Sequence, residues 1–119
     1  MIRLKRAYEQ PTADDGLRIL VERLWPRGLT KEQARIDRWF KDIAPSPDLR
    51  KWYSHNLNLW DEFQYRYRQE LDQNPEVARL LQVLSQEKNV TFVLAARDIE
   101  HSSAKILEDY LMEIDDVND

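Results

Sequence analysis

Three short stretches of the chain have the apolar patterns of β-strands. Residues 2–8 alternate between two sides, one of them more apolar, which is typical of a strand with one buried face. Residues 17–24 are an apolar, β-branched run that ends before Pro26, because proline has no backbone N–H to donate to a sheet. Residues 89–96 are almost continuously apolar, as expected for a strand buried on both faces. The sequence therefore predicts three strands.

Other segments have apolar residues at helical spacing. Thr30 with Gln33 forms a capping box, so a helix or helix pair is expected there, and Ser46 before Pro47 opens a further, short helix. The predicted helices span residues 30–43, 47–52 and 59–72, then 75 to about 84, and finally the segment after Asp98. Most of the aromatic residues on them, including Trp39, Trp52 and Trp60, are expected to cover the sheet.

Strands separated by helical segments are typical of an α/β fold. We predict a small, mainly parallel sheet of about three strands covered by several helices. The length of 119 residues fits one domain, which we expect to span residues 1–119. Strand order stays open, because three strands can pair in more than one way.

Composition excludes several classes of function. The chain has no cysteine, which rules out disulfides, thiolate zinc sites and cysteine nucleophiles, and favours a reducing, cytoplasmic compartment. No apolar run approaches the roughly 20 residues that span a membrane. The chain has only two glycines, which are too far apart to form a phosphate-binding loop. Its two histidines are also far apart and give no clear metal site. We therefore expect no cofactor and no metal.

Charge is distributed unevenly along the chain. Residues 1–68 contain 14 Lys and Arg against 10 Asp and Glu, whereas residues 69–119 contain 4 against 12. A local basic face on an acidic protein would attract a small anion without the broad phosphate affinity of a duplex binder, so binding of duplex nucleic acid is not expected. The alternative is that most of these charges lie on solvated helix faces and pair with each other.

The most informative stretch is residues 23–28, where two arginines and a tryptophan surround a proline. In extended backbone Arg23, Trp25 and Arg27 project to one side, and Lys31 would widen the positive surface. Guanidinium groups bind carboxylate or phosphate through two hydrogen bonds, and tryptophan stacks on flat rings, so this group suits a planar anionic ligand. The alternative is an arginine paired with a local carboxylate and a tryptophan in the core.

Further candidates follow the strand predicted at residues 89–96. If that strand and the strand at 17–24 are parallel, Arg97 would lie at the same edge as the two arginines above. His101 would lie in the first turn of the last helix, where its ordinary pKa of about 6.5 suits proton transfer. Asp98 and Glu22 are the candidate carboxylates. Helix capping by Asp98, and a buried ion pair between Glu22 and an arginine, are the structural alternatives.

Four motifs together resemble the YeaO-like family, an uncharacterised family known as a domain of unknown function. They are residues 20–28 (LVERLWPRG), 39–46 (WFKDIAPS), 49–52 (LRKW) with His55, and 95–98 (AARD) with Glu100 and His101. The resemblance covers most of the chain and implies a small α/β domain without a settled activity. Two positions depart from the family pattern, in which Asp is common at Glu22 and Asn is frequent at Ser102.

Two functional hypotheses follow. The first is a domain that binds a small anionic molecule through Arg23, Trp25, Arg27, Lys31 and Arg97; in an enzyme, His101, Asp98 and Glu22 would transfer protons. The second is an interaction module for single-stranded nucleic acid or a protein partner, a homodimer included.

Overall fold

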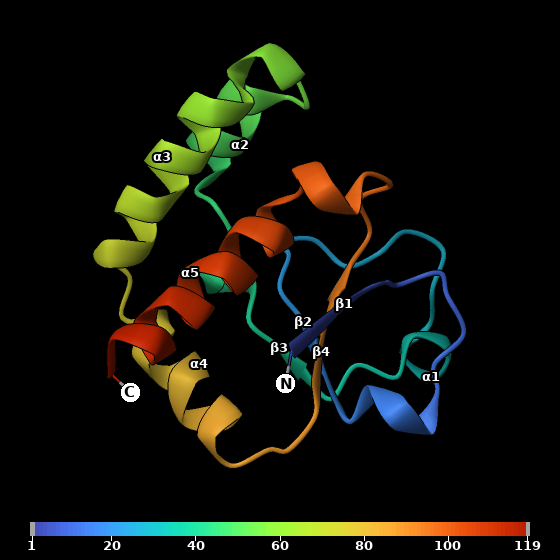
Figure 1. The fold of residues 1–119 in the computed structure, drawn as a ribbon. Coiled ribbons are helices and arrows are strands. Elements are labelled where there is room, and N and C mark those ends of the chain that lie inside the picture. Colours follow the sequence, from blue (N-terminus) through green and yellow to red (C-terminus); the bar gives the residue numbers. More distant parts are fainter. Residues whose placement is uncertain (1, 119) are drawn as a thin grey trace.

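The chain folds around a parallel sheet of four strands, described here for residues 2–118 in a computed structural model (Figure 1). The strands are β1 (Ile2–Arg6), β2 (Leu17–Leu20), β3 (Arg38–Trp39) and β4 (Val90–Leu94). Their order across the sheet is β1-β4-β2-β3. This arrangement confirms the predicted α/β fold and the parallel pairing of the second apolar run with the last one.

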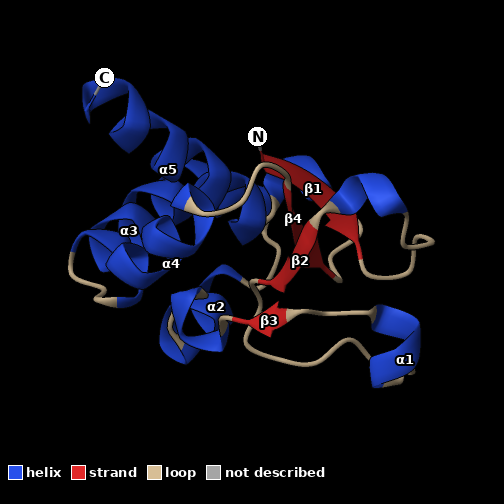
Figure 2. Ribbon diagram, turned by 90° about the horizontal axis from the view of Figure 1, so that it is seen from below, coloured by secondary structure: helices blue, strands red, loops and turns tan. Residues whose placement is uncertain are grey.

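Five α-helices and four 3₁₀ turns make up the other regular elements of residues 2–118. The α-helices are α1 (Lys31–Ala34), α2 (Pro47–Tyr53), α3 (Trp60–Asp72), α4 (Glu76–Ser85) and α5 (Ser103–Asn118). The 3₁₀ turns are η1 (Ala13–Asp15), η2 (Lys41–Ile43), η3 (Leu57–Leu59) and η4 (Ile99–His101). The four longer helices gather on one side of the sheet, and α1 lies on the other (Figures 1 and 2).

The helix predicted over residues 30–43 is wrong beyond its first turn. The capping box of Thr30 and Gln33 forms, but α1 ends when Arg35 adopts a left-handed φ of 48°. The chain then pairs with β2, since the Asp37 N–H donates to Arg18 O and the Phe40 N–H donates to Leu20 O, each at 2.9 Å. Pairing with the sheet therefore overrides the helical pattern. It also leaves Trp39 41% exposed, so its assignment to a core-facing helix was wrong too.

The helix-covered face of the sheet is apolar. In the register of the sheet, Leu4, Phe92 and Ile19 lie in one row across β1, β4 and β2. Side chains alternate between the two faces of a strand, so this row shares its face with Val90 and Leu94. These β4 side chains are buried and belong to the main core beneath the helices. The continuous burial predicted for this strand is therefore confirmed.

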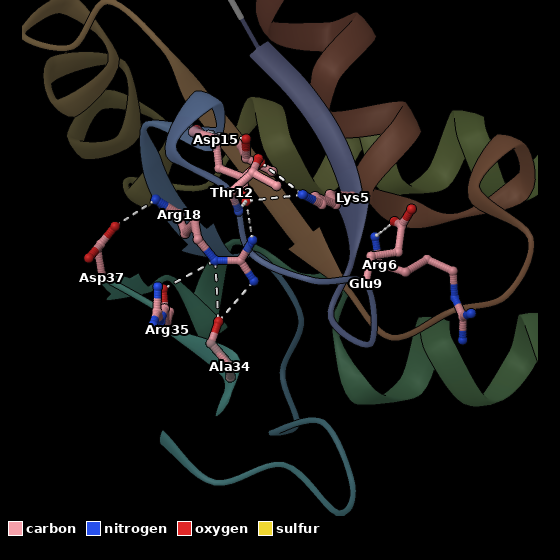
Figure 3. A network of polar contacts seen from close by, with 10 residues as sticks. Lys5, Arg6, Glu9, Thr12, Asp15, Arg18, Ala34, Arg35 and Asp37 are labelled. Atoms are coloured by element: carbon pink, nitrogen blue, oxygen red, sulfur yellow. Dashed lines mark hydrogen bonds and ion pairs between the residues drawn. The ribbon is translucent and has the colours of Figure 1, made fainter. Parts of the chain in front are cut away.

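The opposite face is closed by charged groups instead of a long helix (Figure 3). Lys5 pairs in register with Val93, and Arg18 with Thr91. Asp15, in η1, accepts from the Lys5 ammonium at 3.0 Å and pairs with the Arg18 guanidinium at 2.7 Å. The side chains of Asp15 and Arg18 are only 3% and 4% exposed. A buried ionic cluster thus covers this face.

The Arg18 guanidinium extends this cluster to α1. Its Nη2 donates to Ala34 O at 2.8 Å, and its Nε lies 3.2 Å from both Ala34 O and Arg35 O. These are carbonyls at the carboxyl end of α1, which have no partner within so short a helix. Arg18 therefore joins η1, β2 and the end of α1 (Figure 3).

Burial by itself would raise the pKa of the Asp15 carboxyl. Hydrogen bonds from the Thr12 backbone, Lys5, the Thr12 hydroxyl and Arg18 outweigh burial, so its pKa falls well below the usual range. The folded state therefore favours the ionised form, relative to an unfolded aspartate with a pKa of about 3.9. This contribution to stability is complete above roughly pH 5 and is lost as the pH falls below about 4.

We predict that Asp15→Asn lowers the free energy of unfolding by about 3–5 kcal/mol at pH 7, because it leaves Arg18 buried without its counter-charge. Asp14→Asn is the matched control, since Asp14 is the exposed neighbour in the same turn. Urea unfolding between pH 3 and 7 measures both variants. The difference between wild type and Asp15→Asn should shrink in acid, and equal losses in the two variants would contradict the role of the ion pair.

Gly16 allows η1 to pass directly into β2. Its φ is +63°, and a Cβ built there would lie 2.1 Å from Asn89 O, which accepts the Leu17 N–H at 3.0 Å. Gly28 also has a positive φ, of +80°, but a Cβ there would meet open space. The two glycines thus separate the effect of backbone conformation from that of close packing.

We predict that Gly16→Ala lowers the free energy of unfolding by about 2–4 kcal/mol, because it adds a backbone collision to the cost of a left-handed φ. Gly28→Ala should cost about 1 kcal/mol, from the φ alone. Thermal and urea unfolding of both variants provide the measurement. Similar losses at the two glycines would show that β2 can move away from Asn89 at little cost.

Candidate functional site

A cavity of about 570 Å³ lies beyond the carboxyl ends of β1, β2 and β4. Parallel strands bring these ends to one edge of the sheet, where ligands bind in open α/β folds. The residues that line the cavity are Tyr8, Glu22, Arg23, Leu24, Trp25, Pro26, Arg27, Ala44, Pro45, Arg50, Lys51, Tyr53, Ser54, His55, Phe63, Ala95, Ala96, His101, Ser102 and Ser103. Five of the eight predicted site residues are among them, namely Glu22, Arg23, Trp25, Arg27 and His101.

Glu22 bridges the diverging ends of β2 and β4. Its Oε1 accepts from the Ala95 N–H at 2.7 Å. From the other side, the Arg6 guanidinium donates to Ala96 O at 3.1 Å and to Ala95 O at 3.4 Å. The backbone that follows β4 is thus held between a carboxylate and a guanidinium. The partner of Glu22 is a backbone amide, where the sequence had suggested an arginine.

The Glu22 carboxyl has a pKa above its ordinary value. Burial raises its pKa, and this effect exceeds the lowering by the backbone N–H groups of Ala95 and Ala96 and by the charges of His55 and Arg50. A raised pKa means that the folded protein binds a proton more readily than the unfolded chain. Glu22 therefore lowers the free energy of unfolding as the pH rises from the ordinary pKa of a glutamate to the pKa of Glu22 in the folded protein.

Arg23 is held by weak contacts only. Its guanidinium lies 3.3 Å from the Asp42 carboxylate and 3.4 Å from Ala44 O and Pro45 O. Its buried Nε has no hydrogen-bond partner among the residues described. Long contacts and an unsatisfied N–H leave this side chain able to reorient toward a ligand at small cost.

Trp25 and Arg27 form one wall of the cavity. The Trp25 Nε1 donates to Leu29 O at 2.7 Å, and its ring meets Trp39 edge-on with centroids 5.6 Å apart. Trp25 is therefore half-buried and fixed, with part of its surface on the cavity. The backbone carbonyl of Arg27 accepts from the Tyr8 hydroxyl at 3.0 Å, while its side chain is exposed. The guanidinium of Arg27 makes no hydrogen bond or ion pair within the described part of the chain, whose side chains run from residue 2 to 114.

The carboxyl end of α2 supplies cations that sequence reasoning missed. Arg50 and Lys51 line the cavity, and neither side chain has a hydrogen bond or ion pair with the rest of the described chain. Ser54 and His55 follow with left-handed φ values of 43° and 58° and turn the chain at the cavity wall. Basic residues in the last turn of a helix are common because they complement its dipole, so this pair gave no separate signal.

His101 and Asp98 form a pair at the opposite wall. The Nδ1 of His101 lies 2.8 Å from Asp98 Oδ2, and the His101 N–H reaches Asp98 Oδ1 at 3.3 Å. Trp60 meets the imidazole edge-on, with ring centroids 5.1 Å apart. Asp98 caps the 3₁₀ turn η4 and orients His101 without lining the cavity itself. Capping and orientation are thus combined in one carboxylate.

Arg97 and Lys31 do not line the cavity. Arg97 is exposed between β4 and η4, and Lys31 is exposed at the start of α1, on the other side of the sheet from the longer helices. The structure therefore brings Arg23 and Arg27 to the cavity but places Arg97 outside its lining. The basic character of the site comes instead from Arg23, Arg27, Arg50 and Lys51.

Among the side chains described, those of residues 2–114, no three of His, Cys, Asp or Glu gather at a spacing that would hold a metal ion. Over residues 2–118, none of the helices combines the length and the apolar content needed to cross a membrane. The ionisable side chains that line the cavity are those of arginine, lysine, histidine, tyrosine and one glutamate.

Comparison with known proteins gives family membership without an activity. The model of the inactive DUF488-N3 subclade matches residues 1–119. An uncharacterized protein of Mycobacterium tuberculosis, Rv3073c, is 42% identical over 110 residues, 92% of each chain. The uncharacterized protein YeaO of Escherichia coli is 34% identical over 110 residues, 92% of this chain and 96% of YeaO. No solved structure matches significantly. The chain therefore belongs to the inactive DUF488-N3 subclade, a YeaO-like family of unknown function.

Proposed function

We propose that the cavity binds a small molecule bearing a carboxylate or phosphate group. The main support is that Arg27, Arg50 and Lys51 line the cavity without an ion-pair partner among the described side chains of residues 2–114. Unpaired cations in a concave site attract and hold an anion, and guanidinium groups do so with directed hydrogen bonds. Arg23, with its long contacts, is a fourth cation that a ligand could recruit.

The size and walls of the cavity support a ligand with a flat, apolar part. A volume of about 570 Å³ falls in the range of small-molecule sites. Tyr53 and Phe63 contribute to the wall and stack on each other, with ring centroids 4.1 Å apart and an interplanar angle of 5°. Trp25 adds a third aromatic surface. Such walls give an aromatic carboxylate or a nucleotide-like phosphate contacts in addition to those that the cations offer any anion, inorganic sulfate included.

Binding without turnover is the activity we favour. His101, oriented by Asp98, and Glu22, with its raised pKa, are the groups that could transfer protons in a reaction. The family to which the chain belongs is described as inactive. We therefore assign these three residues to ligand recognition and charge balance in the cavity.

The alternative, an interaction module for single-stranded nucleic acid, has weaker support. Stacking of bases needs free aromatic faces. Tyr8 and Trp39 are exposed, but the Arg6 guanidinium lies over the Tyr8 ring at 5.4 Å and Lys41 lies over the Trp39 ring at 5.5 Å. Cations of the protein itself therefore occupy ring faces that bases would need.

We predict that an anionic ligand found by thermal-shift screening of carboxylates, phosphates and nucleotides loses about 10- to 100-fold in affinity in Arg27→Ala and in Arg50→Ala. Each variant removes charge-assisted hydrogen bonds worth about 1.5–3 kcal/mol. At about 100 times its dissociation constant, the ligand should stabilise the wild type by about 2.7 kcal/mol, or roughly 10 °C. Isothermal titration then gives the affinity of each variant.

Two further variants sharpen this experiment. Arg3→Ala removes an exposed arginine of β1, distant from the cavity lining, and should leave the affinity unchanged. Arg97→Ala tests whether an arginine outside the lining still reaches the ligand. The proposal fails if no anion shifts the wild type, or if Arg3→Ala weakens binding as much as Arg27→Ala does. Binding of oligonucleotides alone, with steep loss in added salt, would favour the interaction module.

A further inference from the structure

Glu22 is the only acidic residue among those described that line the cavity. Four permanent cations share the cavity with it: Arg23 and Arg27 from its own segment, and Arg50 and Lys51 from α2. The titratable rings of His55 and His101 and the hydroxyls of Tyr8 and Tyr53 complete the ionisable groups that face the cavity. Any anion held by the cations is therefore held beside one carboxyl group.

The surroundings of Glu22 stabilise a carboxylate only in part. The Ala95 N–H donates to Oε1 at 2.7 Å, and the carbonyls of the same backbone segment are held from the far side by Arg6. Among the described side chains of residues 2–114, none forms an ion pair with Glu22. The cations that line the cavity are thus the main counter-charge of an ionised Glu22. A bound anion would compete for these same cations.

We propose that Glu22 takes up a proton when the cavity binds an anion, and that Glu22 thereby makes binding depend on pH. The proposal rests on the anion-binding function proposed above and names its regulation. Two negative charges in one partly buried site repel each other, whereas a neutral carboxyl group removes the repulsion and can donate a hydrogen bond to the anion. The raised pKa of Glu22 keeps the cost of this protonation low.

The proton requirement gives the cavity a selectivity among anions. A fully ionised anion such as sulfate brings no proton, so its binding has to draw one from solvent to Glu22. A phosphate monoester below its second pKa of about 6 is a monoanion that still carries a proton, and it can pass this proton to Glu22 as it binds. Below that pH Glu22 therefore favours such weak-acid anions over strong-acid dianions such as sulfate. By linkage, the anion raises the pKa of Glu22 by the same free energy with which protonation strengthens anion binding.

Isothermal titration of inorganic sulfate tests this coupling. The full chain carries His55→Gln and His101→Gln, so that neither imidazole contributes protons. Titrations from pH 5.5 to 8, at constant ionic strength, in two buffers of different ionisation enthalpy, give the number of protons bound per sulfate. We expect uptake to approach one proton, and the affinity to fall about tenfold per pH unit above the native pKa of Glu22.

Glu22→Gln in the same background is the decisive variant. Glutamine keeps an oxygen that accepts the Ala95 N–H and resembles the protonated acid, so sulfate should bind with no proton uptake and with an affinity that does not change with pH. Asp42→Asn is the control, because it removes a carboxylate beside Arg23 but outside the cavity lining. Proton uptake should persist in Asp42→Asn. Urea unfolding verifies that each variant is folded.

The possible failures differ. Proton uptake that persists in Glu22→Gln, or a sulfate affinity that is independent of pH in the histidine-free parent, overturns the role of Glu22 while leaving anion binding in place. A lack of sulfate binding to the wild type at every pH, together with no shift by any other anion, overturns the proposed function itself and the coupling with it.

Discussion

The arrangement of this small sheet depends on the ion pairs that the buried Asp15 carboxylate makes with Lys5 and Arg18. Long helices cover one face, and the other face has only η1, α1 and loops to close it. Lys5, Asp15 and Arg18 fill that face with paired charges, and Arg18 adds hydrogen bonds to the end of α1. The position of β2, and of every residue that follows it into the cavity, is therefore set by an ionic layer in place of an apolar one.

The ends of the strands in this sheet also form the floor of the cavity. The pairing of β2 with β4 ends at Leu20 and Val93, with a last hydrogen bond from the Val21 N–H to Val93 O. Beyond it, Glu22 joins the two strand ends by accepting the Ala95 N–H. Arg6, at the end of β1, holds the same backbone from the opposite side. Three adjacent strand ends are thus tied together by two charged side chains. The walls above them come from α2, η4 and the start of α5, which pack on the apolar face of the sheet or on each other.

Local patterns predicted the elements with strong periodicity and failed where distant pairing decided the structure. The run through Val90–Leu94 and the helical spacing of α3, α4 and α5 were sufficient, because burial on a face imposes those patterns. Strand β3 was missed, since its two residues are held by hydrogen bonds to β2 that no local pattern encodes. Arg18 lies within the run predicted as an apolar strand and was not singled out, although it is the central cation of the buried cluster.

Part of the cavity lining could be predicted from the sequence, because it follows directly from the ends of strands that local patterns identify. Residues that follow parallel strands lie at the same edge of a sheet. This rule placed Glu22, Arg23, Trp25 and Arg27 at the edge where His101 also lies. Arg97 also follows a strand, but the chain there turns into η4, which leaves Arg97 exposed and directs His101 to the cavity. Arg50 and Lys51 reach the site from a helix that is distant in sequence. Their contribution follows from the packing of α2, which sequence patterns do not specify.

Charge balance explains why one carboxyl group belongs in a cavity built from cations. Among the side chains described, those of residues 2–114, Arg27, Arg50 and Lys51 have no ion-pair partner, so an ionised Glu22 would offset their mutual repulsion. In the proposed complex the anion would take over that role, and an ionised Glu22 would be a surplus negative charge. A permanently charged residue would suit only one of these two states. A partly buried carboxyl with a raised pKa suits both, because it can gain a proton when an anion binds.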